Sequence, residues 1–458
     1  MRVARNVIVV IGIAAFAIPA WSQQRAAERY RPPVADLEVH QQVAMPPGFG
    51  VQHTDVDGPV FVDARGMTMY KWQKRGQRNG DVGEVKGKPT CDGTKYTVSS
   101  GLMSPYPPGL QLPDLDTRPT CIEAWPPVYA GDDAKDVGKF SVVERGDGRK
   151  QWAYDGYALY TSYLDKAPGQ VNGAQSQRRV GEPGGLRTPV GPPPVHPPAF
   201  EVATVATGRL LTMKAGYSVY VSDADGPNKS NCNAACQSEW KRVAAGHTSV
   251  AQGEWGIIDV GPGQRQWTFR GRPLYTRVQD RMFHSLEGSD SPGWHNVYTQ
   301  RMPDLPKDMT IQDSRIGQVI ADKDGRTVYI YNCIDDALDQ MVCNHPATTQ
   351  AYRLAICGNG DPALCNKTWP YLLAAANEKS AGLIWGTAWI DPTTGRFAEP
   401  DAAGALHVRT FRDRPLYLYS GDTEPGDPYG DGWGEVMGAR NGFKAFWVRR
   451  DDFVTNPD

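Results

Sequence analysis

A short pattern, in which a turn residue is followed four places later by Tyr, occurs six times in this chain of 458 residues. The turn residue is Gly in five copies and Asp413 in the sixth. The tyrosines that end the pattern are Tyr70, Tyr160, Tyr220, Tyr275, Tyr329 and Tyr417. Because self-similarity along a chain is the signature of a repeat architecture, this pattern constrains the fold before any residue is given a role.

A second motif, Cys-x-x-x-Trp, lies between the two tyrosines of each pair and sorts the six patterns into three repeats. Trp125 to Tyr160 and Trp240 to Tyr275 are both 35 residues. Trp369 to Tyr417 is 48 residues, which predicts an insertion near residues 391–404 of the third repeat. An aromatic residue precedes the second tyrosine by six places in every repeat, as Tyr154, Phe269 and Phe411.

The chain is predicted to contain three domains joined by segments rich in Pro and Gly, which favour an extended form. With 49 Gly, 37 Pro and alternating apolar and polar positions around Gly turns, the repeats favour short strands and tight turns over long helices. We therefore predict a mainly β fold of three tandem, small, disulfide-bonded domains, each with short antiparallel strands and one short helix. The predicted segments are a signal peptide (1–22), an extended leader (23–51), repeat 1 (52–175), a linker (176–199), repeat 2 (200–300), a linker (301–315) and repeat 3 (316–453).

The N-terminus has the features of an export signal. Arg2 and Arg5 precede an apolar run at residues 7–20, and a small-x-small cleavage site ends at Ser22. The apolar run is shorter than the roughly 20 residues that span a bilayer, which favours cleavage over an uncleaved anchor. The first Cys is Cys91, which argues against a lipid anchor at the cleavage site. We expect a bacterial periplasmic or secreted protein without a transmembrane segment in the mature chain.

The charge of the chain argues against nucleic acid as a partner. The formal net charge is −2, and loss of Arg2 and Arg5 with a signal peptide that contains no acidic residue makes it −4. The sequence also has no long basic run of the kind that binds a phosphate backbone.

Eight cysteines in an exported chain predict four disulfides. The repeat suggests their connectivity, because the Cys of each Cys-x-x-x-Trp motif has one upstream neighbour at a variable distance, and loop length costs little closure entropy. The predicted pairs are Cys91–Cys121, Cys232–Cys236, Cys357–Cys365 and, in repeat 3 alone, Cys333–Cys343. Alternatively, Cys232 and Cys236 form a redox pair, because two Cys within one helical turn are poorly placed for an unstrained bridge.

Zinc is disfavoured because no His accompanies these cysteines at ligand spacing. The sequence has no Cys-x-x-Cys-His, so it does not attach a haem covalently. Carboxylates at Asp422, Asp427 and Asp431 lie in a Gly-rich loop that could hold Ca²⁺. The loop lacks the EF-hand order, so we favour a solvated turn and expect no cofactor.

The repeated tyrosines and tryptophans have two interpretations. They could form an exposed surface that stacks sugars or quinones, but in domains of about 100 residues they are also the largest side chains available to a core. We favour the core. Gln151-Trp152 and Gln266-Trp267 match between repeats 1 and 2, and we place His407-Val408 at the corresponding position of repeat 3.

These motifs resemble a bacterial family known as the secreted repeat of unknown function, a lipoprotein repeat with a Tyr-x-aromatic-x-x-Asp motif. The segment from Tyr417 to Asp422 matches the motif fully, whereas the segments that end at Asp165 and Asp280 keep only its Tyr and Asp. Repeats 1 and 3 also keep Pro after the Cys-x-x-x-Trp motif. The resemblance covers nearly all of residues 55–450 in three copies and implies an exported bacterial protein, but it says little about activity.

We therefore predict an exported binding or structural module with a protein, glycan or small-molecule partner. A redox or electron-transfer accessory protein that uses Cys232 and Cys236 is the main alternative. A periplasmic hydrolase is the second, although His284, His295 and His345 accompany no recognisable nucleophile. The departures from the repeat pattern gather in repeat 3, which makes it the candidate for a specialised task.

Overall fold

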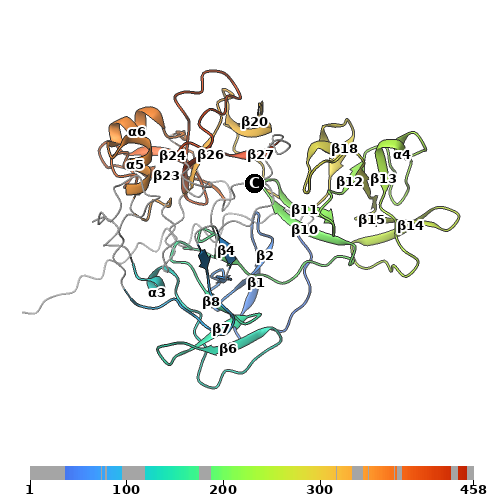
Figure 1. The fold of residues 1–458 in the computed structure, drawn as a ribbon, viewed down its shortest axis with the longest axis horizontal. Helices are drawn as coiled ribbons and strands as arrows, with labels where there is room; N and C mark the ends of the chain where they lie inside the picture. Colours follow the sequence, from blue (N-terminus) through green and yellow to red (C-terminus); the bar gives the residue numbers. More distant parts are fainter. Residues whose placement is uncertain are drawn as a thin grey trace, which may run out of the picture.

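The computed structural model describes residues 37–73, 75–77, 80–94, 119–174, 187–315, 317–332, 344–348, 350–375, 377–378, 384–434 and 442–450. The predicted signal peptide and the predicted Cys333–Cys343 pair lie outside these residues. Figure 1 shows three groups of short strands, with repeat 1 in blue and teal, repeat 2 in green and yellow, and repeat 3 in orange and red. The prediction of a mainly β fold with small antiparallel sheets is confirmed.

The described part of repeat 1 contains a five-stranded sheet, two hairpins and one helical turn. Its elements are β1 (Gly50–His53), β2 (Pro59–Val62), β3 (Tyr70–Lys71), β4 (Arg75–Gln77), β5 (Gly80–Val82), α3 (Cys121–Ala124), β6 (Phe140–Glu144), β7 (Lys150–Tyr154), β8 (Tyr157–Tyr160) and β9 (Thr188–Pro189). The sheet order is β6-β7-β8-β3-β9. Strand β9 lies within the predicted linker 176–199 and completes the sheet of repeat 1.

Repeat 2 divides the same kind of strands among three small sheets, ordered β10-β11-β19, β13-β17-β12-β18 and β14-β15-β16. Its elements are β10 (Phe200–Val205), β11 (Gly208–Met213), β12 (Tyr220–Ser222), α4 (Cys236–Glu239), β13 (Trp240–Arg242), β14 (Trp255–Gly261), β15 (Gln264–Phe269), β16 (Arg272–Pro273), β17 (Tyr275–Arg277), the 3₁₀ helix η2 (Glu287–Asp290), β18 (Trp294–Asn296) and β19 (Tyr298–Arg301).

Repeat 3 has a five-stranded sheet, β23-β24-β25-β22-β26, and a three-stranded sheet, β20-β21-β27, whose strand β20 lies within the predicted linker 301–315. Its described residues contain two α-helices, whereas those of repeats 1 and 2 contain one each. Asp361 caps the second helix by accepting a hydrogen bond from the Ala363 amide, and Pro362 occupies its first turn. The elements are β20 (Met309–Ser314), β21 (Gly317–Asp322), β22 (Tyr329–Asn332), α5 (Ala351–Gly358), α6 (Pro362–Thr368), β23 (Trp385–Ile390), β24 (Leu406–Phe411), β25 (Arg414–Tyr417), β26 (Gly442–Ala445) and β27 (Trp447–Arg450).

The two repeated tyrosines of each repeat face each other across one antiparallel strand pair. Tyr70 is opposite Tyr160, Tyr220 is opposite Tyr275, and Tyr329 is opposite Tyr417. On its other side, the strand of the first tyrosine pairs with β9, β18 or β26. The regular spacing of the tyrosines in the sequence therefore corresponds to one strand register, which all three repeats share.

The turn before the second tyrosine has the same backbone in all three repeats. Its two central residues both have positive φ, as a two-residue hairpin turn of type I′ requires. The second of them is Gly156 in repeat 1 and Gly271 in repeat 2, whereas Asp413 adopts φ 60° in repeat 3. A side chain other than Gly is uncommon in this region of backbone conformation.

The three repeats meet at residues 54–58, the tip of the β1–β2 hairpin, here called the hairpin tip. From repeat 2, Gln300 donates a hydrogen bond to the carbonyl of Thr54. From repeat 3, the Ile384 amide donates to Asp55 Oδ2 at 3.0 Å, and Val56 packs within the core of that repeat. The chain order is 1-2-3, but repeat 1 contacts both of the others.

Candidate functional site

In each repeat, the first tyrosine is hydrogen-bonded to the aspartate that lies five residues after the second tyrosine. The hydroxyl of Tyr70 donates to Asp165 Oδ2 at 2.7 Å. The same bond joins Tyr220 to Asp280 at 2.8 Å and Tyr329 to Asp422 at 2.6 Å. The Asp of the Tyr-x-aromatic-x-x-Asp motif thus binds the other half of its repeat, because it accepts a hydrogen bond from the first tyrosine.

The tryptophan of each Cys-x-x-x-Trp motif packs edge-to-face on the same first tyrosine. The ring centroids are 5.4 Å apart for Tyr70–Trp125, 5.2 Å for Tyr220–Trp240 and 5.2 Å for Tyr329–Trp369. The six tyrosines and three tryptophans are at most 3 % exposed. They form the core of each repeat, so the hypothesis that they make an exposed stacking surface is wrong.

Burial changes the acid–base properties of the three tyrosine–aspartate pairs. It raises the pKa of Asp165 to about 7, although the Tyr70 hydroxyl and the Asn172 amide oppose the shift. It also raises the pKa of Asp422 to about 6, against the opposing hydrogen bond from Tyr329. The pKa of Asp280 is raised for the same reason. These carboxyls have the shifted pKa expected of a catalytic acid, but each is bonded to the hydroxyl of a buried tyrosine, and Asp165 and Asp280 are themselves buried.

The second tyrosine has a carboxylate partner in repeats 1 and 2. Tyr160 donates to Glu84 Oε1 at 2.5 Å, and Tyr275 donates to Asp225 Oδ2 at 2.7 Å. In repeat 3, the Tyr417 ring instead packs against the ring of Tyr371, with the centroids 5.0 Å apart. The buried Arg353 guanidinium lies 5.6 Å from the centre of the Tyr417 ring. Among the described residues of repeat 3, the charged group beside the second tyrosine is therefore a cation that lies over its ring.

A side chain from the last strand of the sheet covers one face of the tryptophan ring of the Cys-x-x-x-Trp motif. Trp294 stacks on Trp240 and Phe443 stacks on Trp369, each with a centroid separation of 3.8 Å. The register of the strands places Arg187 at the corresponding position of repeat 1, and its guanidinium lies 4.6 Å from the centre of the Trp125 ring. A planar cation thus takes the place of an aromatic ring, because both can stack on an indole.

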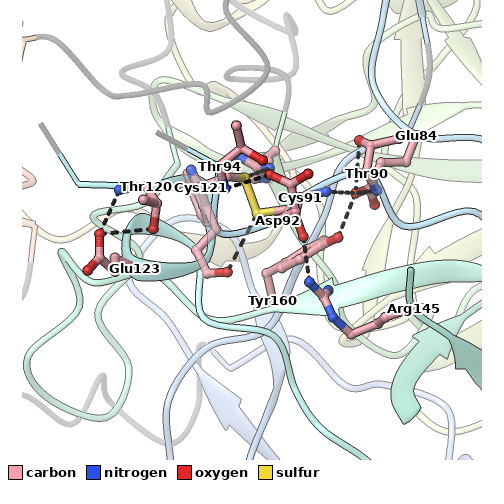
Figure 2. Close-up of a disulfide and its surroundings, with 12 residues drawn as sticks. Glu84, Thr90, Cys91, Asp92, Thr94, Thr120, Cys121, Glu123, Arg145 and Tyr160 are labelled. Carbon is pink, nitrogen blue, oxygen red and sulfur yellow. Dashed lines mark hydrogen bonds between the residues drawn. A yellow bond between two sulfur atoms is a disulfide. The ribbon is translucent and has the colours of Figure 1, made fainter. Parts of the chain in front are cut away.

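The disulfide of repeat 1 ties the helical turn α3 to the segment before it (Figure 2). Cys91 and Cys121 are bonded, with Cα atoms 5.4 Å apart. Glu84 accepts hydrogen bonds from the amides of Thr90 and Cys91, and Arg145 donates to the carbonyl of Cys91 at 2.6 Å. The same Glu84 oxygen accepts the Tyr160 hydroxyl, so the disulfide and the second tyrosine share one anchor.

The other described cysteines form the predicted bonds Cys232–Cys236 and Cys357–Cys365. Cys232 precedes helix α4 and Cys236 begins it, so the two are not in one helical turn. Cys365 is buried, and Arg353 donates to its sulfur at 3.2 Å. Cys236 differs from the cysteines of the other two bonds because it is only half-buried.

The strand that carries Tyr160 and the loop that carries Asp165 lie in a segment that matches a known family model. Residues 141–177 match the family model of a secreted repeat of unknown function. Neither the curated proteins nor the solved structures contain a match to this chain. The matched segment of the secreted repeat includes β7, β8 and Asp165, and it ends beyond Asn172, whose amide donates to Asp165.

The match to the secreted repeat agrees with a structural module, and its description assigns no activity. It covers one copy, at the end of repeat 1 and the first two residues of the predicted linker. No helix in the described ranges is long and apolar enough to cross a membrane.

The matched Gln-Trp positions are structural, and the sequence alignment of repeat 3 needs a correction. Gln151 and Gln266 are buried and donate to the carbonyls of Leu159 and Leu274. Gln151 and Gln266 each form an isolated β-bridge with the residue four places after the Trp of the Cys-x-x-x-Trp motif. In repeat 3, the residue that forms this bridge is Val408, and its partner is Leu373. The residues at the Gln-Trp positions are therefore Val408 and Arg409, one residue later than the predicted His407-Val408.

The carboxylates considered for Ca²⁺ each stabilise the backbone of their own repeat. Asp422 accepts from Tyr329 and from the Tyr429 amide, Asp427 from the Glu424 amide, and Asp431 from the Ala445 amide. In the described part of the chain, no group of three His, Cys, Asp or Glu side chains lies close enough together to hold a metal ion.

Among the described residues, neither His295 nor His345 is paired with a nucleophilic side chain. His295 forms an exposed pair with Asp223 at 2.7 Å. His345 is buried, which lowers its pKa well below the usual value. Neither arrangement gives the hydrolase hypothesis a residue with a catalytic role.

Proposed function

We propose that the chain is an exported module of three copies of the secreted repeat, which binds a glycan through aromatic side chains of repeat 3. The signal at residues 1–22, cut near Ser22, would deliver it to the periplasm or the cell exterior. The residues common to all three repeats build the core, as their burial shows. A binding surface is therefore expected among the residues in which the repeats differ.

The observation that carries this proposal is the pair of exposed rings in the loop after Asp422. Tyr429 is 52 % exposed and Trp433 is 43 % exposed. The Trp433 ring lies 5.7 Å from that of the half-buried Tyr419, and the Arg315 guanidinium lies 4.5 Å from the centre of the Tyr429 ring. Exposed rings beside polar groups suit a sugar, whose apolar ring face can stack while its hydroxyls form hydrogen bonds.

The proposal predicts that Trp433→Ala weakens glycan binding at least tenfold, or about 1.4 kcal/mol. Binding would be measured by calorimetry against soluble oligosaccharides from chitin, cellulose and peptidoglycan. Phe283→Ala is the matched control, because Phe283 is 64 % exposed but lies in repeat 2. The proposal fails if no oligosaccharide binds the wild type, or if the two variants bind equally well.

A redox role remains the second candidate because Cys236 is half-buried. Thiol–disulfide exchange requires access of the attacking thiolate to a sulfur atom. We expect a mild reductant to open Cys232–Cys236 at least tenfold faster than Cys91–Cys121 or Cys357–Cys365 in the folded protein. Thiol labelling followed by peptide mass spectrometry measures the order, and equal resistance of the three bonds would rule out this redox role.

A further inference from the structure

Repeat 3 contacts repeat 1 through the β24–β25 turn, residues Arg412, Asp413 and Arg414, here called the docking turn. Arg412 donates to Asp57 Oδ2 at 3.0 Å and to the carbonyl of Val171 at 3.1 Å. Arg414 donates to the carbonyl of Asn172 at 2.9 Å. Both arginines are buried, at 3 % and 0 % exposure. The corresponding turns of repeats 1 and 2 contain Gly where this turn has Asp413.

Asp413 is the residue that departs from the repeat, and its side chain crosses to repeat 1. Its Oδ2 accepts a hydrogen bond from Asn172 Nδ2 at 2.7 Å. The backbone amide of the same Asn172 donates to Asp165 Oδ1 at 2.7 Å. One asparagine thus connects a carboxyl of repeat 3 with the core carboxyl of repeat 1. The positive φ of Asp413 costs conformational energy, which this contact offsets.

We propose that the docking turn is a proton-sensitive contact, which holds repeats 1 and 3 together while Asp165 or Asp413 carries a proton and releases them more readily when both are ionised. The two carboxyls belong to different repeats and share one neighbour, so their negative charges oppose each other across the interface. Separation would hydrate both groups and relieve this repulsion.

The environment of the two carboxyls supports this direction. Burial raises the pKa of both groups, and the charge of Asp413 raises that of Asp165 further. Arg414 and Lys166 oppose the shift at Asp413 without cancelling it. The charged or titratable groups around the pair are Asp57, Tyr70, Tyr163 and Lys166 from repeat 1, and His345, Arg412 and Arg414 from repeat 3.

A small cavity lies between the repeats at this interface. It is lined by residues of the hairpin tip, by Val171 and Asn172, and by Ile384 and Arg412 of repeat 3. Asn172 Oδ1 and Arg412 Nε face no hydrogen-bond partner among the described residues. Polar atoms of this kind favour water in a cavity.

Hydrogen–deuterium exchange of the full chain, corrected for the intrinsic pH dependence of exchange, tests the proposal. The probe is the Ile384 amide, because its hydrogen bond to Asp55 crosses the interface. If opening releases one proton, the opening constant at Ile384 rises by up to tenfold per pH unit between pH 5 and pH 7 and levels off above pH 7. The Val328 amide, bonded to Ile320 within repeat 3, should not follow this change, which separates interface opening from unfolding of the repeat.

Asp413→Asn keeps a hydrogen-bonding side chain but removes one titrating group, so it should reduce the pH dependence at Ile384. Asp413→Gly restores the residue of the other two repeats and serves if the first variant does not fold. Asp155→Asn, in the corresponding turn of repeat 1, is the control and should leave the dependence unchanged. An Ile384 amide that exchanges independently of pH in the wild type, or equally steeply in both Asp413 variants, would overturn the proposal.

Discussion

Replacing Trp369 by Ala is expected to lower the free energy of unfolding of repeat 3 by about 3–5 kcal/mol, as for other buried Trp side chains. Trp369 is 0 % exposed, stacks on Phe443 and packs edge-to-face on Tyr329. Its removal would leave a cavity beside the Tyr329–Asp422 hydrogen bond, which the rigid sheet could fill only in part. Denaturant unfolding with the disulfides intact, followed by near-ultraviolet circular dichroism, measures the loss.

Trp433→Ala is the control for this prediction. Trp433 lies in the same repeat, but its 43 % exposure means that less surface returns to water on unfolding. We expect a loss below about 1 kcal/mol, in the range of surface substitutions that touch few buried groups. Similar losses for the two variants would contradict the assignment of Trp369 to the core and Trp433 to the surface.

The free energy of unfolding is expected to fall by about 3 kcal/mol between pH 5 and pH 8 through Asp165 alone. Burial raises the pKa of this carboxyl from 3.8 in the unfolded chain to about 7 in the folded protein. Between these two values the folded state binds a proton that the unfolded state does not, so this contribution to stability is present at low pH. This contribution decreases as the pH rises toward 7, and above pH 7 almost none of it is left.

Asp165→Asn mimics the protonated carboxyl and should flatten the pH dependence of unfolding. Urea unfolding at pH 5, 6, 7 and 8 provides the comparison. Asp422→Asn tests the same effect in repeat 3, where the pKa of about 6 predicts a smaller loss that ends at lower pH. Asn in place of the exposed Asp133 should retain the wild-type slope. A wild-type protein that gains stability between pH 5 and pH 8 would refute a raised pKa at Asp165.

Much of the architecture could be predicted because it is encoded by local spacing. The turn-to-tyrosine distance of four residues recurs because each tyrosine follows a hairpin-like turn. The bonds Cys91–Cys121, Cys232–Cys236 and Cys357–Cys365 follow from the fixed place of one cysteine before Trp. The core role of the aromatic residues follows from their size in small domains.

The alignment of the Gln-Trp positions was wrong by one residue in repeat 3. Shifting the Gln-Trp position of repeat 3 by one residue moves every side chain of a strand to the opposite face. His407-Val408 and Val408-Arg409 differ by such a shift, and the bridge from Leu373 to Val408 decides for the second. The insertion removed the distance from Trp369 as a guide, but the nine residues from Gln151 to Tyr160 and from Gln266 to Tyr275 place Val408 at the same distance before Tyr417.

The sequence by itself determined that this chain is built from three related β units with a common core, because turns, disulfides and strand periodicity act over short distances along the chain. Only the tertiary structure decided which partners the repeated residues take. Tyr70 and Asp165 are 95 residues apart yet share a hydrogen bond. In repeat 1, Arg187 occupies the position that an aromatic ring occupies in repeats 2 and 3. Asp413 accepts a hydrogen bond from Asn172, which lies 241 residues away in the sequence. These contacts depend on how strands and repeats are placed against one another, which residue spacing does not specify.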